Sequence, residues 1–412
     1  MLETRASHKP KLSLLEFAAM MAYMISLVAL SIDAMLPVID VIGRDMGITD
    51  PNKPQLIIGT LFFGLTLGQL IYGPLSDSIG RKRAIFAGLG LFVFGCVLTM
   101  IAQDFNTMLF GRFLQGLGVA GPRIVSTAVV RDVYEGREMA KVTSFIMSFF
   151  IIVPAVAPML GQWISDIWNW RAVYFSLLAM AVFVSLWYGI RQGETLRPQD
   201  RRSFAPASVF AGFAEVLRVR VTVGYAVAAG IVYGAFIAYL MTSPQLFEDV
   251  FGIKDHFPYF FGALAICIGS AALVNANLVM RLGMHKLCRW ALYAKAILSI
   301  TFFVYAVLHG GTLPLAAFMI WAGFSFFLLG ILFGNVNAIA MQPVGHMAGV
   351  GSAVVGFVSG MLSLGIGTII GQIYGGTVLP LIGGFALLAP LSILVMLWAD
   401  GGRGTNDQAS PH

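Results

Sequence analysis

Charged residues are scarce in this sequence. Only 11% of its 412 residues are Asp, Glu, Lys or Arg, and 58% are hydrophobic, whereas a soluble domain carries about 25% charged residues. A chain with so little charge cannot cover its folded surface with hydrated groups. The composition therefore excludes an ordinary soluble protein and predicts a protein that folds within lipid.

Cysteine is also rare, and no catalytic set of side chains is evident. Cys96, Cys267 and Cys288 lie in or beside apolar segments. Their odd number and wide spacing allow neither a disulfide framework nor a metal-ligand pattern. The sequence offers no paired His/acid set and no Ser/His/Asp arrangement. We therefore expect no enzyme, no bound metal and no cofactor.

Long apolar runs separated by short polar breaks are what the sequence does contain. A membrane-spanning helix needs about 20 mainly apolar residues, whereas barrel strands are only about 10 residues long with strict alternation. The sequence predicts an all-α membrane protein with twelve transmembrane helices, at 14–36, 55–75, 84–103, 107–130, 140–164, 170–190, 221–246, 257–279, 287–308, 313–338, 348–374 and 377–399.

The basic residues indicate how these helices are oriented. Of the 26 Lys and Arg, 19 lie on the alternate segments that include the N-terminus, four lie on the opposite loops, and three lie inside spans. Cytoplasmic loops carry such an excess, so both termini are expected in the cytoplasm and the net charge of +6 does not require nucleic acid. The first run is too long for a secretory leader and carries Glu16 and Asp33, so we expect it to be a retained span.

One long polar break divides the chain. Residues 191–220 are basic and partly amphipathic, and we expect a cytoplasmic linker there. It would separate a first six-helix half at 1–190 from a second at 221–399, followed by a cytoplasmic tail at 400–412.

Glycines support this division. After the eighth run, Arg281-Leu-Gly-Met-His-Lys286 echoes Ile79-Gly80-Arg-Lys-Arg83 after the second run when Gly283 is aligned with Gly80. Small residues also repeat every four positions at Gly64-x3-Gly68 and at Gly367-x3-Gly371-x3-Gly375. Such stripes let helices approach closely. They predict either contact between the second and eleventh spans or ordinary helix packing.

Two charged residues inside spans are candidates for proton coupling. A charge at mid-membrane depth costs at least ~2.5–3.5 kcal/mol on insertion scales and calls for a reason. Asp33, followed by Ala-Met-Leu-Pro37, and Arg112 are both expected in the outer half of the membrane. A carboxyl balanced between burial, which opposes ionisation, and a nearby Arg, which favours it, can take and release a proton. The alternatives are a fixed ion pair or interfacial position for Asp33, and an Arg112 that bonds backbone carbonyls of the first span.

Other polar residues within spans are candidates for a substrate cavity. Arg123 lies 11 residues after Arg112, about three turns or ~16 Å along the same helical face, just after Gly121-Pro122. It either lines a central cavity and favours anionic or strongly hydrogen-bonding substrates, or pairs with an acid at the cytoplasmic mouth. The uncharged candidates are Gln115, Asn335 and Asn337, although most amides in membranes simply join helices. The remaining buried cation, Lys295, is expected to reach the inner interface.

Two further motifs are predicted to shape the transport path. The turn Gly73-Pro-Leu-Ser-Asp77-Ser-Ile-Gly80-Arg81-Lys-Arg83 lies between two spans, and Asp77, Arg81 and Arg131 are expected to meet at the cytoplasmic side. The alternative is solvated loop charge, worth under ~1 kcal/mol.

The second motif lies in the fifth span. Pro154, Pro158 and Gly161 predict a bent helix with a groove that packs tightly.

Together these motifs resemble those of the bicyclomycin/chloramphenicol resistance group of drug:proton antiporters, within the major facilitator superfamily. The resemblance covers the whole membrane region and rests on Asp33-x3-Pro37, the turn 73–83, Arg112-x2-Gln-Gly, Val130-Arg131-Asp132-Val-Tyr134 and Gly345-His-Met-Ala-Gly349-x2-Ser352. The fifth span resembles the antiporter motif Gly-Pro-x-x-Gly-Gly, with Ala157 and Gln162 in place of the outer glycines. Two further departures are Arg123, where the family has a small apolar residue, and Ile25, where some relatives carry a second acid.

The resemblance implies a proton-coupled exporter of small lipophilic drugs or antibiotics that works by alternating access in the bacterial inner membrane. Asp33 and Arg112 would couple protons, with Gln115 in support, and the cluster at Gly73, Asp77, Gly80, Arg81, Arg83 and Arg131 would lock the two halves. The expected partners are a small-molecule substrate, protons and the lipid bilayer, and the protein is expected to be a monomer. A proton-coupled importer of a small metabolite is the alternative, and substrate identity and stoichiometry stay open.

Overall fold

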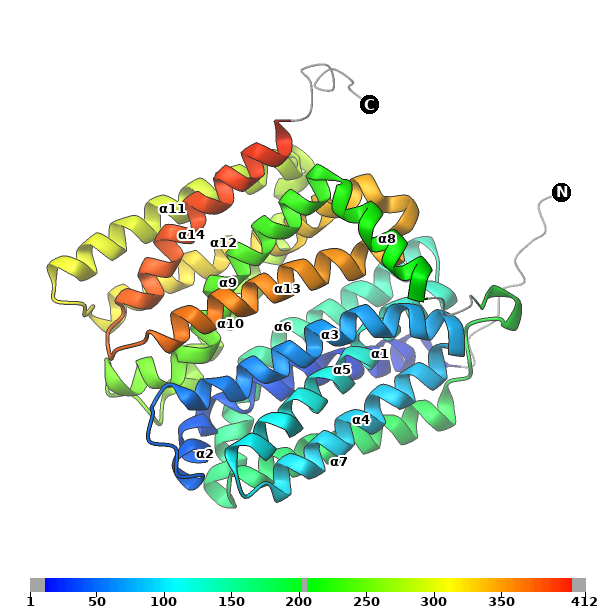
Figure 1. Cartoon of the computed structure of the whole chain (residues 1–412), viewed down its shortest axis with the longest axis horizontal. Helices are drawn as coiled ribbons and strands as arrows, with labels where there is room; N and C mark the ends of the chain where they lie inside the picture. Colours follow the sequence, from blue (N-terminus) through cyan, green and yellow to red (C-terminus); the bar gives the residue numbers. More distant parts are fainter. Residues whose placement is uncertain (1–11, 202–205, 402–412) are drawn as a thin grey trace. The chain divides into compact units, whose positions relative to one another are not determined.

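The computed structural model describes residues 12–201 and 206–401, and every regular element in these ranges is helical. Its α-helices are α1 (Leu14–Asp33), α2 (Ile39–Asp45), α3 (Leu56–Ile79), α4 (Arg81–Ile101), α5 (Phe105–Val133), α6 (Gly136–Ile167), α7 (Trp170–Arg191), α8 (Pro206–Arg218), α9 (Arg220–Asp249), α10 (Phe257–Leu282), α11 (Met284–Leu308), α12 (Leu315–Met341), α13 (Ala348–Gln372) and α14 (Leu379–Asp400). Figure 1 shows them along the chain. The N-terminal segment 1–11, residues 202–205 of the linker and residues 402–412 of the tail lie outside the described residues.

Twelve of the described helices are long and apolar enough to cross a membrane. The predicted all-α membrane fold is confirmed, with helix ends a few residues beyond the apolar runs. The largest difference is the first span, which covers Leu14–Asp45 because α1 continues through a 3₁₀ turn at Leu36–Val38 into α2. Pro37 explains this turn, since proline cannot donate the hydrogen bond that would continue α1.

The structure consists of two packed units. One contains the described parts of Met1–Met35 and Gly64–Phe204, and the other contains Leu36–Phe63 and the described part of Ala205–His412. The predicted boundaries of the two six-helix halves remain a prediction.

Glycines bring α4 and α5 together in the first unit. A Cβ at Gly88 would lie 2.7 Å from the Gly118 carbonyl oxygen, and one at Gly95 would lie 2.8 Å from the Gln115 nitrogen. Gly64 and Gly68 approach the same helix α5, 2.1 Å from the Phe113 oxygen and 2.9 Å from the Leu117 oxygen. The first glycine stripe therefore joins α3 to α5. Ordinary helix packing describes this stripe, while the second span meets the eleventh nearer its start, where a Cβ at Gly59 would lie 3.8 Å from Leu364 and Thr368.

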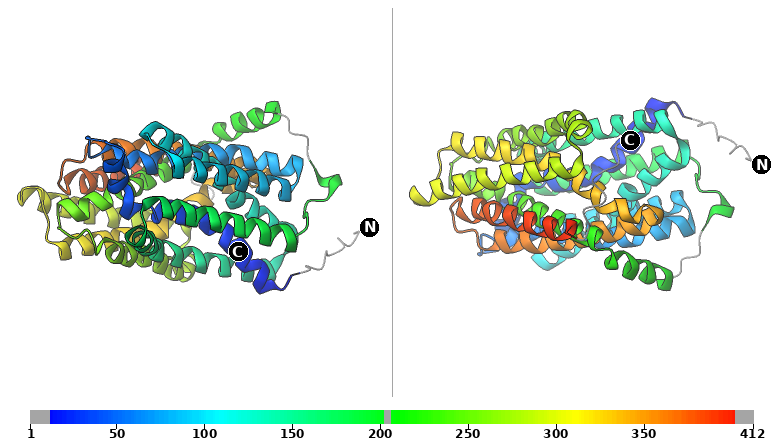
Figure 2. Two further views of the ribbon diagram at one scale, coloured as in Figure 1. Left: turned by 90° about the horizontal axis from the view of Figure 1, so that it is seen from below. Right: turned by 90° about the horizontal axis from the view of Figure 1, so that it is seen from above.

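In the second unit α9 packs against α13, α14 and α12, and α11 lies along α14 (Figures 1 and 2). Its apolar core includes Tyr225, Leu292, Leu332 and Met396. The linker helix α8 lies on α13, where Val216 packs against Val344 and Val354. The expected amphipathic linker segment therefore packs on this unit.

The internal repeat is visible in the backbone. Gly80 precedes α4 with φ 101° and ψ 155°, and Gly283 precedes α11 with φ 73° and ψ 155°. This region of conformational space is essentially reserved for glycine. The alignment of Gly80 with Gly283 therefore marks the same sharp turn in both copies.

Candidate functional site

Asp33 lies at the last residue of α1 and is buried, with only 5% of its surface exposed. A buried carboxyl at the C-terminus of a helix is opposed, when ionised, both by desolvation and by the negative end of the helix dipole. The same position tolerates a neutral carboxylic acid. Asp33 is therefore a buried acidic side chain at the point where α1 ends.

Gly161 of the proline- and glycine-containing motif lies against this site. A Cβ at Gly161 would come within 1.9 Å of the carbonyl oxygen of Ala34, the residue after Asp33. Both Pro154 and Pro158 lie inside the same helix, α6. The motif therefore allows the backbone of α6 to touch the backbone of the first span next to the buried acid.

Arg112 is fully buried, and its side chain bonds to the backbone of the first span. Its Nη2 donates to the Ser31 carbonyl at 2.9 Å, and its Nη1 donates to Gln115 Oε1 at 2.7 Å. Its guanidinium carbon also lies 5.7 Å from the ring centre of Tyr174. Among the residues that the structure describes, Arg112 forms no ion pair with Asp33. The bond to a carbonyl of the first span, one of the two alternatives, is therefore what the structure contains.

Gln115 lies inside a hydrogen-bonded network between α4 and α5. It is completely buried, and its Nε2 donates to Thr99 Oγ1 at 2.9 Å while its Oε1 accepts from Arg112. Thr99 in turn donates to the Cys96 carbonyl at 2.8 Å. Both ends of the amide are used, which fits the predicted support of Arg112 by Gln115, and its predicted place in a substrate cavity stays a prediction.

The two candidate asparagines of α12 differ in burial and in hydrogen-bond partner. Asn335 is buried and donates to Asn275 Oδ1 at 2.6 Å, so its amide joins α12 to α10. Asn337 is half-buried and donates to the Tyr233 hydroxyl at 3.1 Å. The Tyr233 ring stacks on Phe333 at 4.3 Å. Asn337 therefore belongs to a partly exposed surface of amide and aromatic groups, which is a better candidate for contact with substrate than Asn335.

Arg123 is half-buried in the middle of α5, after Pro122. No acidic side chain pairs with it within residues 12–201 and 206–401. The interpretation in which Arg123 pairs with an acid at the cytoplasmic mouth therefore has no partner in the described structure.

The cluster at the predicted cytoplasmic end centres on Arg81. Its guanidinium bonds to Asp77, to Ser76 Oγ at 2.7 Å and to Asp132 Oδ2 at 3.0 Å. Arg131 is exposed and has no described contact with Asp77 or Arg81, whereas the adjacent Asp132 bonds to Arg81. The reason is helical geometry, since one residue turns the side chain by about 100°. Arg83 is exposed as well, and Gly73 lies inside α3, where its carbonyl accepts from Ser76.

The start of the linker completes this cluster. Glu194 accepts from the backbone nitrogens of Arg81 at 2.8 Å and Lys82 at 3.2 Å, which caps the N-terminus of α4. A Cβ at Gly80 would lie 2.4 Å from Glu194 Oε2. Glycine is therefore required at this turn both for the backbone conformation and for space. The sequence did not reveal Glu194 as part of this cluster, because it lies 113 residues beyond Arg81.

Lys295 does not reach a membrane interface, contrary to expectation. Only 2% of its surface is exposed, and its Nζ lies 4.7 Å above the Phe385 ring. The described residues supply no hydrogen-bond partner to this nitrogen. The amine is enclosed because α11 lies along α14, a packing that the sequence did not indicate.

Comparisons with known proteins agree with this architecture. Residues 12–368 match the family model described as Major Facilitator Superfamily. The chain is 29% identical over 349 residues to the uncharacterized MFS-type transporter YdgK of Bacillus subtilis, covering 84% of this chain and 85% of the relative. It is 24% identical over 369 residues to a bicyclomycin resistance protein homolog of Haemophilus influenzae, covering 88% of this chain and 90% of the relative.

Two further comparisons extend this picture. The multidrug resistance protein MdtL of Salmonella dublin is 27% identical over 298 residues, covering 71% of this chain and 72% of the relative. The crystal structure of the human organic anion transporter MFSD10 (TETRAN) superposes with a TM-score of 0.67 at 16% identity, covering 94% of this chain and 100% of that one. This structural likeness concerns the fold alone.

Proposed function

Because this chain belongs to the Major Facilitator Superfamily, a family of membrane transporters, we propose that it exports small lipophilic drugs or antibiotics in exchange for protons. The observation that carries the proposal is the buried carboxyl of Asp33 at the end of α1, with Arg112 bonded to the same helix two residues earlier. The printed names of two relatives, a bicyclomycin resistance protein homolog and a multidrug resistance protein, support drug substrates.

In the proposed cycle, Asp33 takes a proton from outside and later releases it inside. Ionised Asp33 and substrate would be bound in one state, and protonation would weaken substrate binding so that the substrate leaves outward. Each charge moved across 100 mV is worth about 2.3 kcal/mol. That energy corresponds to roughly a 50-fold concentration gradient of substrate, so one proton per cycle is sufficient for useful export.

Arg112 would affect the protonation of Asp33 because it is held in a fixed position near the end of α1. Its bonds to the Ser31 carbonyl and to Gln115 hold the end of α1 against α5. We propose that this positive charge, bonded two residues before Asp33, would favour ionisation of the carboxyl whenever water reaches it. When the site closes, desolvation favours the neutral acid. Alternating access would thereby change the proton occupancy without any movement of Arg112.

The motif in α6 would limit leak of protons. Close contact between Gly161 and the Ala34 carbonyl would narrow any path for water along this side of Asp33. Arg123 and the surface formed by Asn337 and Tyr233 are proposed to contact the substrate. The Arg81 cluster would stabilise one state at the cytoplasmic side of a bacterial inner membrane, in which the chain is proposed to work as a monomer without a cofactor.

The proposal can be tested with purified protein in proteoliposomes, with ethidium and bicyclomycin as probes. An outward-directed transport that depends on an imposed pH gradient is expected for the parent. Asp33→Asn should abolish this dependence, because an amide cannot exchange a proton. The matched control is Asp166→Asn, which removes an exposed acid from the end of α6 and should transport at the parent's rate.

Two results would contradict the proposal. Transport by Asp33→Asn equal to that of the parent under the same pH gradient would remove the proton role of Asp33. Accumulation of a probe in the direction of proton flow would favour the alternative, a proton-coupled importer.

A further inference from the structure

Four amide side chains at one end of the second unit form a hydrogen-bonded group, which we call the outer latch: Asn52, Gln55, Gln245 and Gln372. The segment Leu36–Phe63 belongs by sequence to the predicted first half, yet it packs in the same unit as α9 and α13. The outer latch lies where this segment meets the C-terminal ends of those two helices. By the excess of basic residues on the other loops, this end is predicted to face outside.

Asn52 and Gln372 bond to each other's backbone. Asn52 Nδ2 donates to the carbonyls of Gln372 at 3.1 Å and Tyr374 at 2.9 Å. Gln372 Nε2 donates in return to the Asn52 carbonyl at 2.9 Å. These three bonds join residues 320 or more positions apart in sequence, so they form only when the end of α13 meets the loop before α3.

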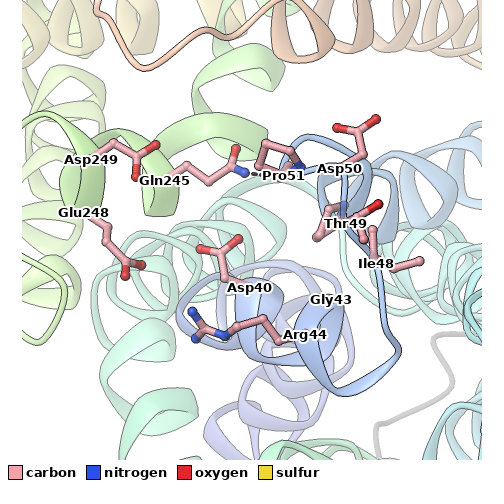
Figure 3. Close-up of a pocket in the computed structure, with 11 residues that line it drawn as sticks. Asp40, Gly43, Arg44, Ile48, Thr49, Asp50, Pro51, Gln245, Glu248 and Asp249 are labelled. Atoms are coloured by element: carbon pink, nitrogen blue, oxygen red, sulfur yellow. Dashed lines mark hydrogen bonds between the residues drawn. The ribbon is translucent and has the colours of Figure 1, made fainter.

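Gln55 and Gln245 make the second half of the outer latch. Gln55 Nε2 donates to Gln245 Oε1 at 2.6 Å. Gln245 Nε2 donates to the Pro51 carbonyl (Figure 3). Both side chains are buried. Gly371 provides the space for Gln55, because a Cβ there would lie 2.5 Å from Gln55 Oε1.

Water can reach one side of the outer latch. A cavity of about 250 Å³ lies directly beside Gln245 and Pro51, and it is lined by Asp40, Arg44, Glu248 and Asp249 among others (Figure 3). A hydrogen bond between neutral groups contributes little net free energy when water can take its place, whereas separation of a buried ion pair is costly. The outer latch is therefore held by several bonds that can open together without exposure of an unpaired buried charge.

A tyrosine adds a tie between the same helices. Tyr374 donates its hydroxyl to Asp249 Oδ2 at 3.2 Å. Burial, together with the nearby Asp249 carboxylate, raises the pKa of the Tyr374 phenol. This hydroxyl consequently stays a donor at every physiological pH.

We propose that the outer latch is the external gate of this transporter: it holds the extracellular side shut in the state described by the structure and must open for release to the outside. This inference depends on transport by alternating access, which the family provides, and not on drug substrates or proton coupling. Met241 offers a way to observe the gate, because it is buried between the glycines at 59 and 371 on the inner side of the latch.

The first experiment measures access to a cysteine at this position in the full-length protein. Met241→Cys is introduced after replacement of the three native cysteines by serine, and intact cells are treated with a membrane-impermeant maleimide. Labelling should be slow. Asn52→Ala should increase its rate about tenfold, which corresponds to about 1.4 kcal/mol, because two donated bonds are lost. Gly371→Ala should act in the same direction by displacing Gln55.

Asn106→Ala is the matched control, since it removes an exposed amide from the first turn of α5. It should leave the labelling rate unchanged. An equal increase with Asn106→Ala, or a change of less than twofold with Asn52→Ala, would overturn the gate. This readout requires no substrate, so it remains decisive even if the proposed drug export is refuted.

The second experiment closes the gate covalently. In the same cysteine-free background, Asn52→Cys and Gln372→Cys together should form a disulfide on mild oxidation. Ethidium transport should then fall to less than a tenth of the parent's rate and recover on reduction. Each single cysteine variant, treated identically, should show no loss of transport that reduction reverses. Full cross-linking without loss of transport would refute the inference.

Discussion

The contact between Gly161 and the first span permits a strong test of the site around Asp33. In Gly161→Ala the new Cβ would lie 1.9 Å from the Ala34 carbonyl oxygen and 2.9 Å from its Cα. Because non-bonded atoms rest about 3.5 Å apart, α6 must move away from the first span by roughly 1.5 Å. Both atoms belong to backbone, so no side-chain rotation can relieve the clash.

The expected cost follows from the rigidity of packed helices. Over-packing of a well-packed contact typically costs about 1–3 kcal/mol. The displaced helix also opens the side of Asp33 that the Gly161 contact closes. We therefore expect both a lower melting temperature and a leak of protons that reduces transport driven by a pH gradient by more than half.

Two measurements check this prediction. Thermal unfolding of the purified protein in detergent, followed by tryptophan fluorescence, reports the loss of stability. Collapse of a pH gradient across proteoliposomes without substrate reports the leak. The matched control is Gly90→Ala, because Gly90 is exposed in α4 and a Cβ there would have no atom within 4 Å. That variant should be as stable as the parent or slightly more stable, since alanine favours a helix more than glycine does.

Parent-like melting and a tight pH gradient in Gly161→Ala would refute the reasoning. Such a result would mean that α6 and the first span do not touch at Ala34, and the proposed seal beside Asp33 would be lost with it. Loss of stability without any leak would keep the contact but remove its role in proton coupling.

Three further predictions concern other parts of the molecule. Gly80→Ala should lower the melting temperature, with a cost of about 1–3 kcal/mol for its backbone conformation and a clash with Glu194; Gly73→Ala, with open space around its Cβ, should not. Arg123→Ala should weaken transport of anionic or zwitterionic compounds and leave ethidium unaffected, so unchanged selectivity in a panel of such compounds would remove Arg123 from the substrate site. Lys295→Met should keep full transport and an equal or higher melting temperature, because an apolar side chain of similar size avoids burial of the amine; loss of transport would instead assign Lys295 a functional role.

The candidate site could be predicted in part. Asp33 and Arg112 stand out in the sequence because a charge within an apolar run requires a specific environment, and the structure buries both. Whether the two side chains contact each other was not predictable in the same way. The sequence allowed either a contact between the two charges or a bond from Arg112 to a carbonyl, and only the packing of α5 against α1 selects the Ser31 carbonyl.

Differences from expectation at single residues have a common cause. Arg131 and Asp132 are adjacent in a motif, yet only Asp132 points toward Arg81. Lys295 is long enough to reach an interface, yet a neighbouring helix encloses it. In both cases the outcome depends on the direction of a side chain relative to another helix, which hydropathy and spacing do not contain.

The sequence by itself determined the number of spans and the correspondence between Gly80 and Gly283. These are local properties, because a bilayer of given thickness and the backbone's own hydrogen bonds act on each segment separately. Tertiary structure alone decided which groups meet. The bonds from Asn52 to the end of α13 and from Glu194 to the start of α4 join residues more than 100 positions apart, and such contacts follow from how helices pack rather than from the composition of any one of them.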